Sequence, residues 1–288
     1  MPIDHTYKEF IERIKTPIRF IKKPIRFIDD NQLHVGEKHI TNFEKEEAVI
    51  IEFRRFTDID IQFQDQYGYI KNTTYQALTE GNCKNPYHPN QYGGCFGVGP
   101  YDGTTTKNMK KAKTAWYHLL ERTSEEFRNK MSDTNKYNSY NNCSVYPDWF
   151  NYQNFAKWYM SYISKLNPNI SYELDKDILQ WGLEYKIYGP YTCALVPHMI
   201  NQAFVGLDRD RENDNLPAGI VKINNRYVAR LRKNGEVAKH LGSFKTVEEA
   251  VEVYKKAKKD YIIELAEYYY SIGALYPEIY QALLNIEL

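Results

Sequence analysis

The strongest constraint on the fold is a segment of about fifty residues, 219–268, whose pattern predicts three short strands followed by a helix. An Asn-Asn pair at 224–225 separates the first two strands, and an Asn-Gly pair at 234–235 is a favoured turn between antiparallel strands. Thr246 and Glu249 have the spacing of a capping box, which marks the start of a helix. The segment therefore predicts a three-stranded antiparallel sheet with a helix packed on one face.

The second strand of this segment sorts its side chains onto two faces. Because side chains alternate along a strand, Tyr227, Ala229 and Leu231 are expected to point toward the helix, and the intervening residues to point away. The residues that point away include Arg226, Arg230 and Arg232, so this face of the sheet is expected to be cationic. A cationic β-ribbon fits the major groove of duplex DNA, where an arginine can donate two hydrogen bonds to guanine. A solvated sheet face accounts for the same pattern equally well. The candidate DNA-binding residues are Lys222, Arg226, Arg230, Arg232, Lys239 and His240.

Residues 226–231 together with the ordered segment LGSFKTVEEA at 241–250 resemble the APETALA-type (ethylene-response-factor) DNA-binding domain. In that family the strands of the sheet bind the major groove. The resemblance therefore implies that duplex DNA is the partner. The positions that would contact it are Arg226, Arg230, Arg232 and His240. His240 stands where the plant domains usually have tryptophan, which implies a different base preference.

Composition narrows the class of protein without identifying a partner. The net charge of the 288 residues is +1, so any case for nucleic-acid binding depends on how the charges are arranged. No apolar run approaches the roughly 20 residues of a membrane span. The four cysteines are scattered, which argues against a disulfide framework or a zinc ribbon and favours the cytoplasm. Frequent Lys, Asn, Ile and Tyr are typical of AT-rich genes in phages and low-GC bacteria.

A second candidate site lies in the centre of the chain, where Asp175 and Asp177 flank Lys176. Carboxylates of this kind can hold magnesium, and a bound metal ion can assist attack on a phosphodiester. A surface Asp-Lys-Asp turn with no chemical role is the alternative interpretation, and on these residues alone it is the simpler one.

Several segments within residues 35–288 resemble phage proteins of the HNH homing-endonuclease type that end in an APETALA-type domain. They are NPYHP at 85–89, YHLLER at 117–122, CSV at 143–145, WFNYQNFAKW at 149–158 and LDKD at 174–177.

In the HNH motif an Asp-His pair opens the site and an Asn or His closes it. The resemblance implies that Asp175 opens the site and that Asn201 closes it, with Lys176 in place of the general-base histidine. Lysine is a weak base at neutral pH unless burial lowers its pKa, so His198 is a candidate substitute. The expected magnesium ligands are Asp175, Asp177 and Asn201, and the expected catalytic residues add Lys176 and His198.

These observations predict an α+β protein of several modules. The leading hypothesis is a phage-type DNA-binding protein that cuts or nicks duplex DNA with magnesium. The alternatives are a catalytically inactive DNA-binding regulator and an effector that blocks a host protein. The predicted modules are a basic arm (1–32), a small β module with a loop (33–103), a central degenerate HNH-like module (104–206), the APETALA-type domain (217–268) and a C-terminal helix (269–288).

Overall fold

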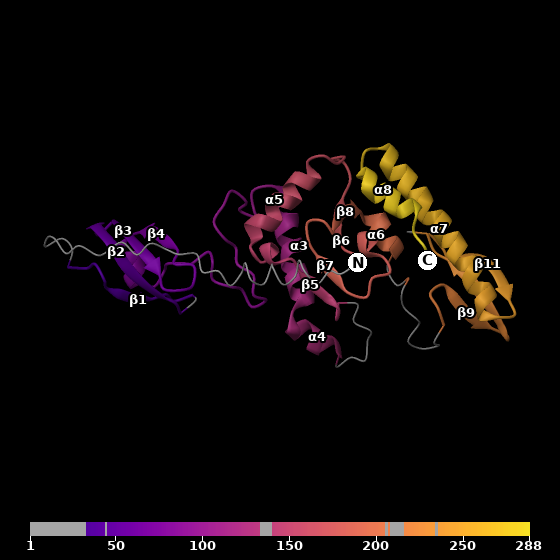
Figure 1. The fold of residues 1–288 in the computed structure, drawn as a ribbon, viewed down its shortest axis with the longest axis horizontal. Coiled ribbons are helices and arrows are strands. Elements are labelled where there is room, and N and C mark those ends of the chain that lie inside the picture. Colours follow the sequence, from indigo (N-terminus) through magenta and orange to yellow (C-terminus); the bar gives the residue numbers. More distant parts are fainter. Residues whose placement is uncertain (1–32, 44, 133–139, 205–206, 208–215, 234–235) are drawn as a thin grey trace, which may run out of the picture. The chain divides into compact units, whose positions relative to one another are not determined.

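A computed structural model describes residues 33–43, 45–132, 140–204, 207, 216–233 and 236–288. The predicted basic arm at 1–32 and the Asn-Gly turn at 234–235 lie outside these residues. Helices and antiparallel sheets both occur, which confirms the α+β class (Figure 1). Contacts divide the chain into two units, residues 1–85 and 86–288, and each is described here by itself. The loop 86–103, which the sequence analysis placed with the β module, belongs to the second unit.

The first unit is a four-stranded antiparallel sheet in the order β1-β2-β3-β4, followed by a short helix. Strand β3 alternates as the sequence predicts, since Ile59, Ile61 and Phe63 are buried. With Ile50 of β2 and Leu78 of the helix they form a separate small core. The elements are β1 (Lys38–Ile40), β2 (Glu47–Arg55), β3 (Asp58–Phe63), β4 (Ile70–Thr73) and α2 (Tyr75–Thr79).

The centre of the second unit packs two helices and two small sheets around one core. Strand β5 pairs with β7 in parallel, and β6 pairs with β8 antiparallel. Buried faces of α3 and α5 contribute Trp116, Leu120, Tyr152 and Phe155 to the core. The elements are α3 (Lys107–Thr123), α4 (Glu125–Ser132), β5 (Cys143–Val145), η2 (Pro147–Phe150), α5 (Tyr152–Ile163), β6 (Tyr172–Asp175), η3 (Ile178–Gln180), β7 (Lys186–Tyr188), β8 (Ala194–Pro197) and α6 (His198–Phe204).

The apolar spacing over residues 110–130 is that of a single helix, but the structure has two helices that meet at Ser124. This residue has an extended backbone, with φ −72° and ψ 153°, so the helical hydrogen bonding of α3 stops there. Its hydroxyl accepts a hydrogen bond from the backbone N–H of Phe127 at 3.2 Å and thereby caps the start of α4. The apolar spacing across both helices is continuous, which is why the sequence did not reveal the break.

The C-terminal part of the second unit has the predicted sheet and helix, with β10 central between β9 and β11. Asn224 and Asn225 both have positive φ, 46° and 62°, as a tight turn between antiparallel strands requires. Thr246 and Glu249 form the predicted capping box. The elements are β9 (Ile220–Ile223), β10 (Arg226–Leu231), β11 (Lys239–Phe244), α7 (Val247–Ser271) and α8 (Pro277–Leu284).

Helix α7 joins this sheet to the centre of the unit. Its first turns cover the sheet through Ala250 and Tyr254, and its later turns bury Ile262, Leu265 and Ala266 in the core that α3 and α5 share. The described residues on both sides of the segment 208–215 therefore belong to one unit, in which α7 connects the small core of the sheet with the larger core.

Lys258 on α7 is buried, and burial lowers the pKa of its ammonium group. Its closest recorded contact is the ring of Tyr261 at 5.9 Å, and no carboxylate among the described residues forms an ion pair with it. We expect Lys258→Met to raise the free energy of unfolding by about 1 kcal/mol at pH 7, because a buried charge is replaced by an apolar side chain.

The gain should shrink as the pH rises toward 10.5, since the folded lysine loses its proton before the unfolded one. Urea unfolding at pH 7 and pH 9.5 measures both effects. Exposed Lys256 on the same helix supplies the control, and Lys256→Met should change stability by less than about 0.5 kcal/mol.

Candidate functional site

The arginines predicted to bind DNA are exposed in the C-terminal sheet, whose outer face is the one that α7 does not cover. Arg226, Arg230 and Arg232 are all exposed, the first two on β10 and the third just after it. His240 of β11 lies directly opposite Arg230, so both side chains project from the same face. The guanidinium of Arg226 donates a hydrogen bond to the backbone oxygen of Ser243 at 3.1 Å, which ties it across to β11.

A β-bulge is responsible for placing His240 beside the arginines. Ala229 pairs with Gly242, but the next residue, Arg230, pairs with His240, so Leu241 is left without a partner in the ladder. Leu241 instead packs on the hydrophobic core. Without the bulge, Leu241 would stand opposite Arg230 and His240 would point to the other face.

Lys222 and Lys239 lie on the opposite side from the arginines. Lys222 is in register with Tyr227, and its ammonium lies 5.5 Å from the centre of that ring. Lys239 is in register with Leu231. Because directly opposed residues project from the same face, both lysines belong to the helix side of the sheet, where they are exposed at its two edge strands.

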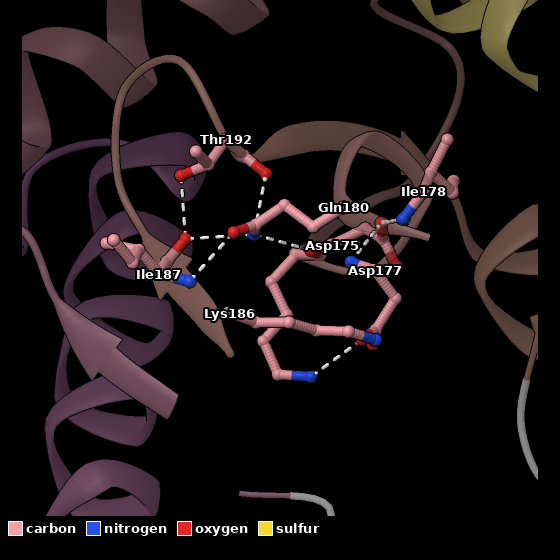
Figure 2. Close-up of polar contacts among 8 residues, drawn as sticks. Asp175, Asp177, Ile178, Gln180, Lys186, Ile187 and Thr192 are labelled. Carbon is pink, nitrogen blue, oxygen red and sulfur yellow. Dashed lines mark hydrogen bonds and ion pairs between the residues drawn. The ribbon is translucent and has the colours of Figure 1, made fainter. Parts of the chain in front are cut away.

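Asp175, at the end of β6, serves as a cap for the short η3 helix. Its Oδ1 accepts hydrogen bonds from the backbone N–H groups of Asp177 (2.9 Å) and Ile178 (2.8 Å), as Figure 2 shows. The residue is only 3% exposed. Burial raises the pKa of its carboxyl to about 6, and the charge of Asp177 adds to this while the two backbone donors oppose it.

Asp177 is held between two lysines. Its Oδ1 lies 2.8 Å from Nζ of Lys176 and 2.5 Å from Nζ of Lys186. Burial alone would lower the pKa of Lys176, but the charge and hydrogen bond of Asp177 outweigh it, and the pKa is raised. Lys176 is therefore a cation at neutral pH, with no lone pair to accept a proton.

Gln180 fastens the same turn to the neighbouring loop. Its amide nitrogen donates to the backbone oxygens of Lys176 (2.8 Å), Ile187 (3.0 Å) and Thr192 (3.3 Å), and its oxygen accepts from the N–H of Ile187 at 2.8 Å (Figure 2). The Asp-Lys-Asp segment is thus a buried, fully bonded turn, rather than the surface turn that the alternative interpretation assumed.

His198 and Asn201 meet a third carboxylate, that of Glu173. The imidazole Nδ1 of His198 lies 2.6 Å from one oxygen of Glu173, and the amide of Asn201 donates to the other oxygen. Helix α6 begins at His198 directly after β8, which pairs with β6, so positions 198 and 201 face the strand that carries Glu173. Sequence analysis missed Glu173, since its role depends on this strand pairing.

The five expected catalytic residues therefore belong to two hydrogen-bonded clusters, and the three expected magnesium ligands have different bonding partners. Asp175 and Asp177 are engaged in the turn around η3, whereas Asn201 bonds Glu173. Within the described ranges, no group of three or more His, Cys, Asp or Glu side chains could hold a metal ion. Magnesium binding by the residues that the HNH resemblance implies therefore stays a prediction.

A groove of about 710 Å³ opens beside the Glu173 cluster, between α3 and the β6–α6 segment. Lys111 of α3 reaches across it and donates to the hydroxyl of Ser171 at 2.9 Å. The charged and polar side chains that line it are those of Lys107, Lys110, Lys111, Thr114, His118, Arg122, Ser171, Glu173 and Asn201.

Comparison with known proteins adds no family to this description: no family model matches the chain, and neither a curated protein nor a solved structure is similar to it. Among the described helices, none is both long enough and apolar enough to cross a membrane.

Proposed function

We propose that this protein binds duplex DNA through the outer face of the β9–β11 sheet and that its HNH-like centre has a structural role. The observation that carries the proposal is the exposure of Arg226 and Arg230 on one face of the sheet, with His240 opposite Arg230 and exposed Arg232 directly after the strand. Arginine forks bond guanine edges or phosphates, and a histidine beside them adds a further donor or acceptor.

Magnesium-dependent cutting or nicking receives less support from the arrangement. Lys176 is protonated and paired with Asp177, and one oxygen of Asp175, Oδ1, accepts hydrogen bonds from two backbone N–H groups. We therefore favour a DNA-binding regulator, acting in the cytoplasm of a bacterial host, over an endonuclease. If the protein does not bind DNA, the hypothesis of an effector that blocks a host protein is favoured.

The test of DNA binding is the double variant Arg230→Ala/Arg232→Ala, titrated against a labelled random-sequence duplex by fluorescence anisotropy at two salt concentrations. We expect affinity to fall by about 30-fold or more, because each arginine contact is worth about 1–3 kcal/mol. The wild-type affinity should also fall steeply with salt, as phosphate neutralisation requires.

The matched control removes two exposed lysines from α7, Lys255→Ala/Lys256→Ala. It lowers the net charge equally and should change affinity by less than about threefold at moderate salt. Equal losses in the two double variants would mean that general attraction, not the sheet, drives binding. An affinity for duplex DNA that does not change with salt concentration would contradict phosphate contact and would favour a protein partner instead.

A supercoiled-plasmid assay with and without magnesium tests cleavage. We expect no relaxation in either condition. Magnesium-dependent relaxation that Glu173→Gln abolishes would restore the endonuclease hypothesis. Glu173→Gln suits this test better than a substitution of Asp175, since loss of the buried Asp175 acceptor would disturb the fold itself.

A further inference from the structure

We propose that the groove between α3 and the β6–α6 segment is a second DNA-contact surface, which takes the phosphodiester backbone without regard to base sequence. The identity of the polyanion rests on the proposed function, whereas the site itself rests on the groove. Its residues are distinct from those of the β9–β11 sheet.

The charge of the groove is strongly unbalanced. Four permanent cations line it, and Glu173 is the carboxylate among its lining residues. That carboxylate already faces the imidazole of His198 and the amide of Asn201. The cations are those of Lys107, Lys110, Lys111 and Arg122.

The cations of the groove are available for a ligand. Lys107 and Lys110 form no ion pair with any carboxylate of the described chain, and the recorded contact of Lys111 is with the neutral hydroxyl of Ser171. Arg122 is half-buried, lies over the ring of Tyr140 at 5.5 Å and forms a hydrogen bond with the side chain of Tyr188. A partly buried guanidinium without a described carboxylate partner is a favourable anion site, because its desolvation is already largely paid.

The arrangement of the cations suits a linear polyanion. Positions 107, 111, 118 and 122 are separated by four, seven and four residues, and Lys110 adjoins Lys111, so the four cations and His118 form a stripe along one face of α3. At 1.5 Å per residue the stripe is about 22 Å long. A compact phosphate ligand needs donors that converge on a point, whereas a nucleic-acid backbone presents charges in a row.

The experiment uses the full chain with Lys107→Ala/Lys110→Ala as the groove variant, Arg230→Ala/Arg232→Ala as the sheet variant and Lys255→Ala/Lys256→Ala as the control. Anisotropy measures affinity for several unrelated duplexes over a salt series. Selection from a random duplex pool measures sequence preference. Circular dichroism melting checks that each variant is folded.

We expect the groove variant to bind all duplexes about tenfold more weakly than the control variant, with unchanged sequence preference and a salt slope lower by about 2. The sheet variant should instead lose its sequence preference. A groove variant that binds like the control overturns the groove proposal and leaves the sheet proposal standing. A sheet variant that keeps affinity and preference, beside a weakened groove variant, overturns the sheet proposal alone.

Labelled polyglutamate provides the last arm. If the groove variant loses polyglutamate binding while its duplex affinity matches the control, the groove is a site for an acidic protein segment and the DNA proposal fails. If polyglutamate binds more weakly than duplex to the wild type and competes poorly, the backbone assignment stands.

Discussion

Asp177→Ala is expected to lower the free energy of unfolding of the second unit by about 3–5 kcal/mol. The substitution removes the carboxylate that lies 2.8 Å from Lys176 and 2.5 Å from Lys186. The side chains of these lysines are only 5% and 13% exposed, whereas that of Asp177 is 34% exposed, so water can replace the lost partner only in part. An uncompensated buried ammonium then remains in the folded state, whereas the unfolded chain solvates it fully.

Urea unfolding followed by tryptophan fluorescence measures this loss, because Trp116, Trp149, Trp158 and Trp181 all belong to the second unit. Glu264→Ala is the control within the same unit. It breaks the Lys233–Glu264 pair, in which both side chains are well exposed, and should cost less than about 1 kcal/mol. If the two substitutions prove equally mild, Lys176 reaches water in solution and its protonated, enclosed state has been misjudged.

The same contacts explain why a structural role for the Asp-Lys-Asp segment is preferred to a catalytic one. A general base needs a free lone pair, and a magnesium ligand needs an oxygen that can turn toward the ion. The charge of Asp177 raises the pKa of Lys176, which is therefore protonated. The Oδ1 atoms of Asp175 and Asp177 already accept hydrogen bonds from backbone and lysine donors. These contacts favour a structural role for the turn over the catalytic role that the HNH resemblance implies.

The features that the sequence predicted correctly are those encoded by neighbouring residues. The Asn224-Asn225 turn and the Thr246–Glu249 capping box are local patterns with a direct conformational cause, and both occur in the structure. The exposure of the arginines on β10 follows from strand alternation, which also needs no distant information.

Features that depend on pairing between distant strands could not be predicted in this way. The bulge opposite Arg230 shifts the register by one residue and brings His240 to the arginine face, while Lys222 and Lys239 fall on the other face. Glu173 meets His198 and Asn201 because β6 pairs with β8. The HNH resemblance instead implied that Asn201, with His198 as a substitute base, belongs with Asp175, two positions further along the same strand.

The second large effect is a pH dependence centred on Asp175. Its folded pKa of about 6 lies above the ordinary value of 3.8 for this carboxyl group, so the folded state binds this proton more tightly than the unfolded state does. The sign follows directly: this group destabilises the fold above pH 6, and the penalty disappears as the pH falls to 3.8. A difference of about two pKa units corresponds to roughly 3 kcal/mol.

Asp175→Asn should therefore stabilise the protein by about 2–3 kcal/mol at pH 7.5, because the amide oxygen can still accept from the N–H groups of Asp177 and Ile178 without carrying charge. Asp175→Ala should instead destabilise it by about 2 kcal/mol or more, since both donors lose their acceptor. Denaturant unfolding of wild type and Asp175→Asn at pH 4, 5, 6 and 7.5 measures the difference directly, and titrations common to both proteins cancel. The gap should close steadily below pH 6. If the difference in free energy of unfolding between the two proteins stays constant across this range, the pKa of Asp175 is not raised by burial. The structural interpretation of the Asp-Lys-Asp turn would then fail.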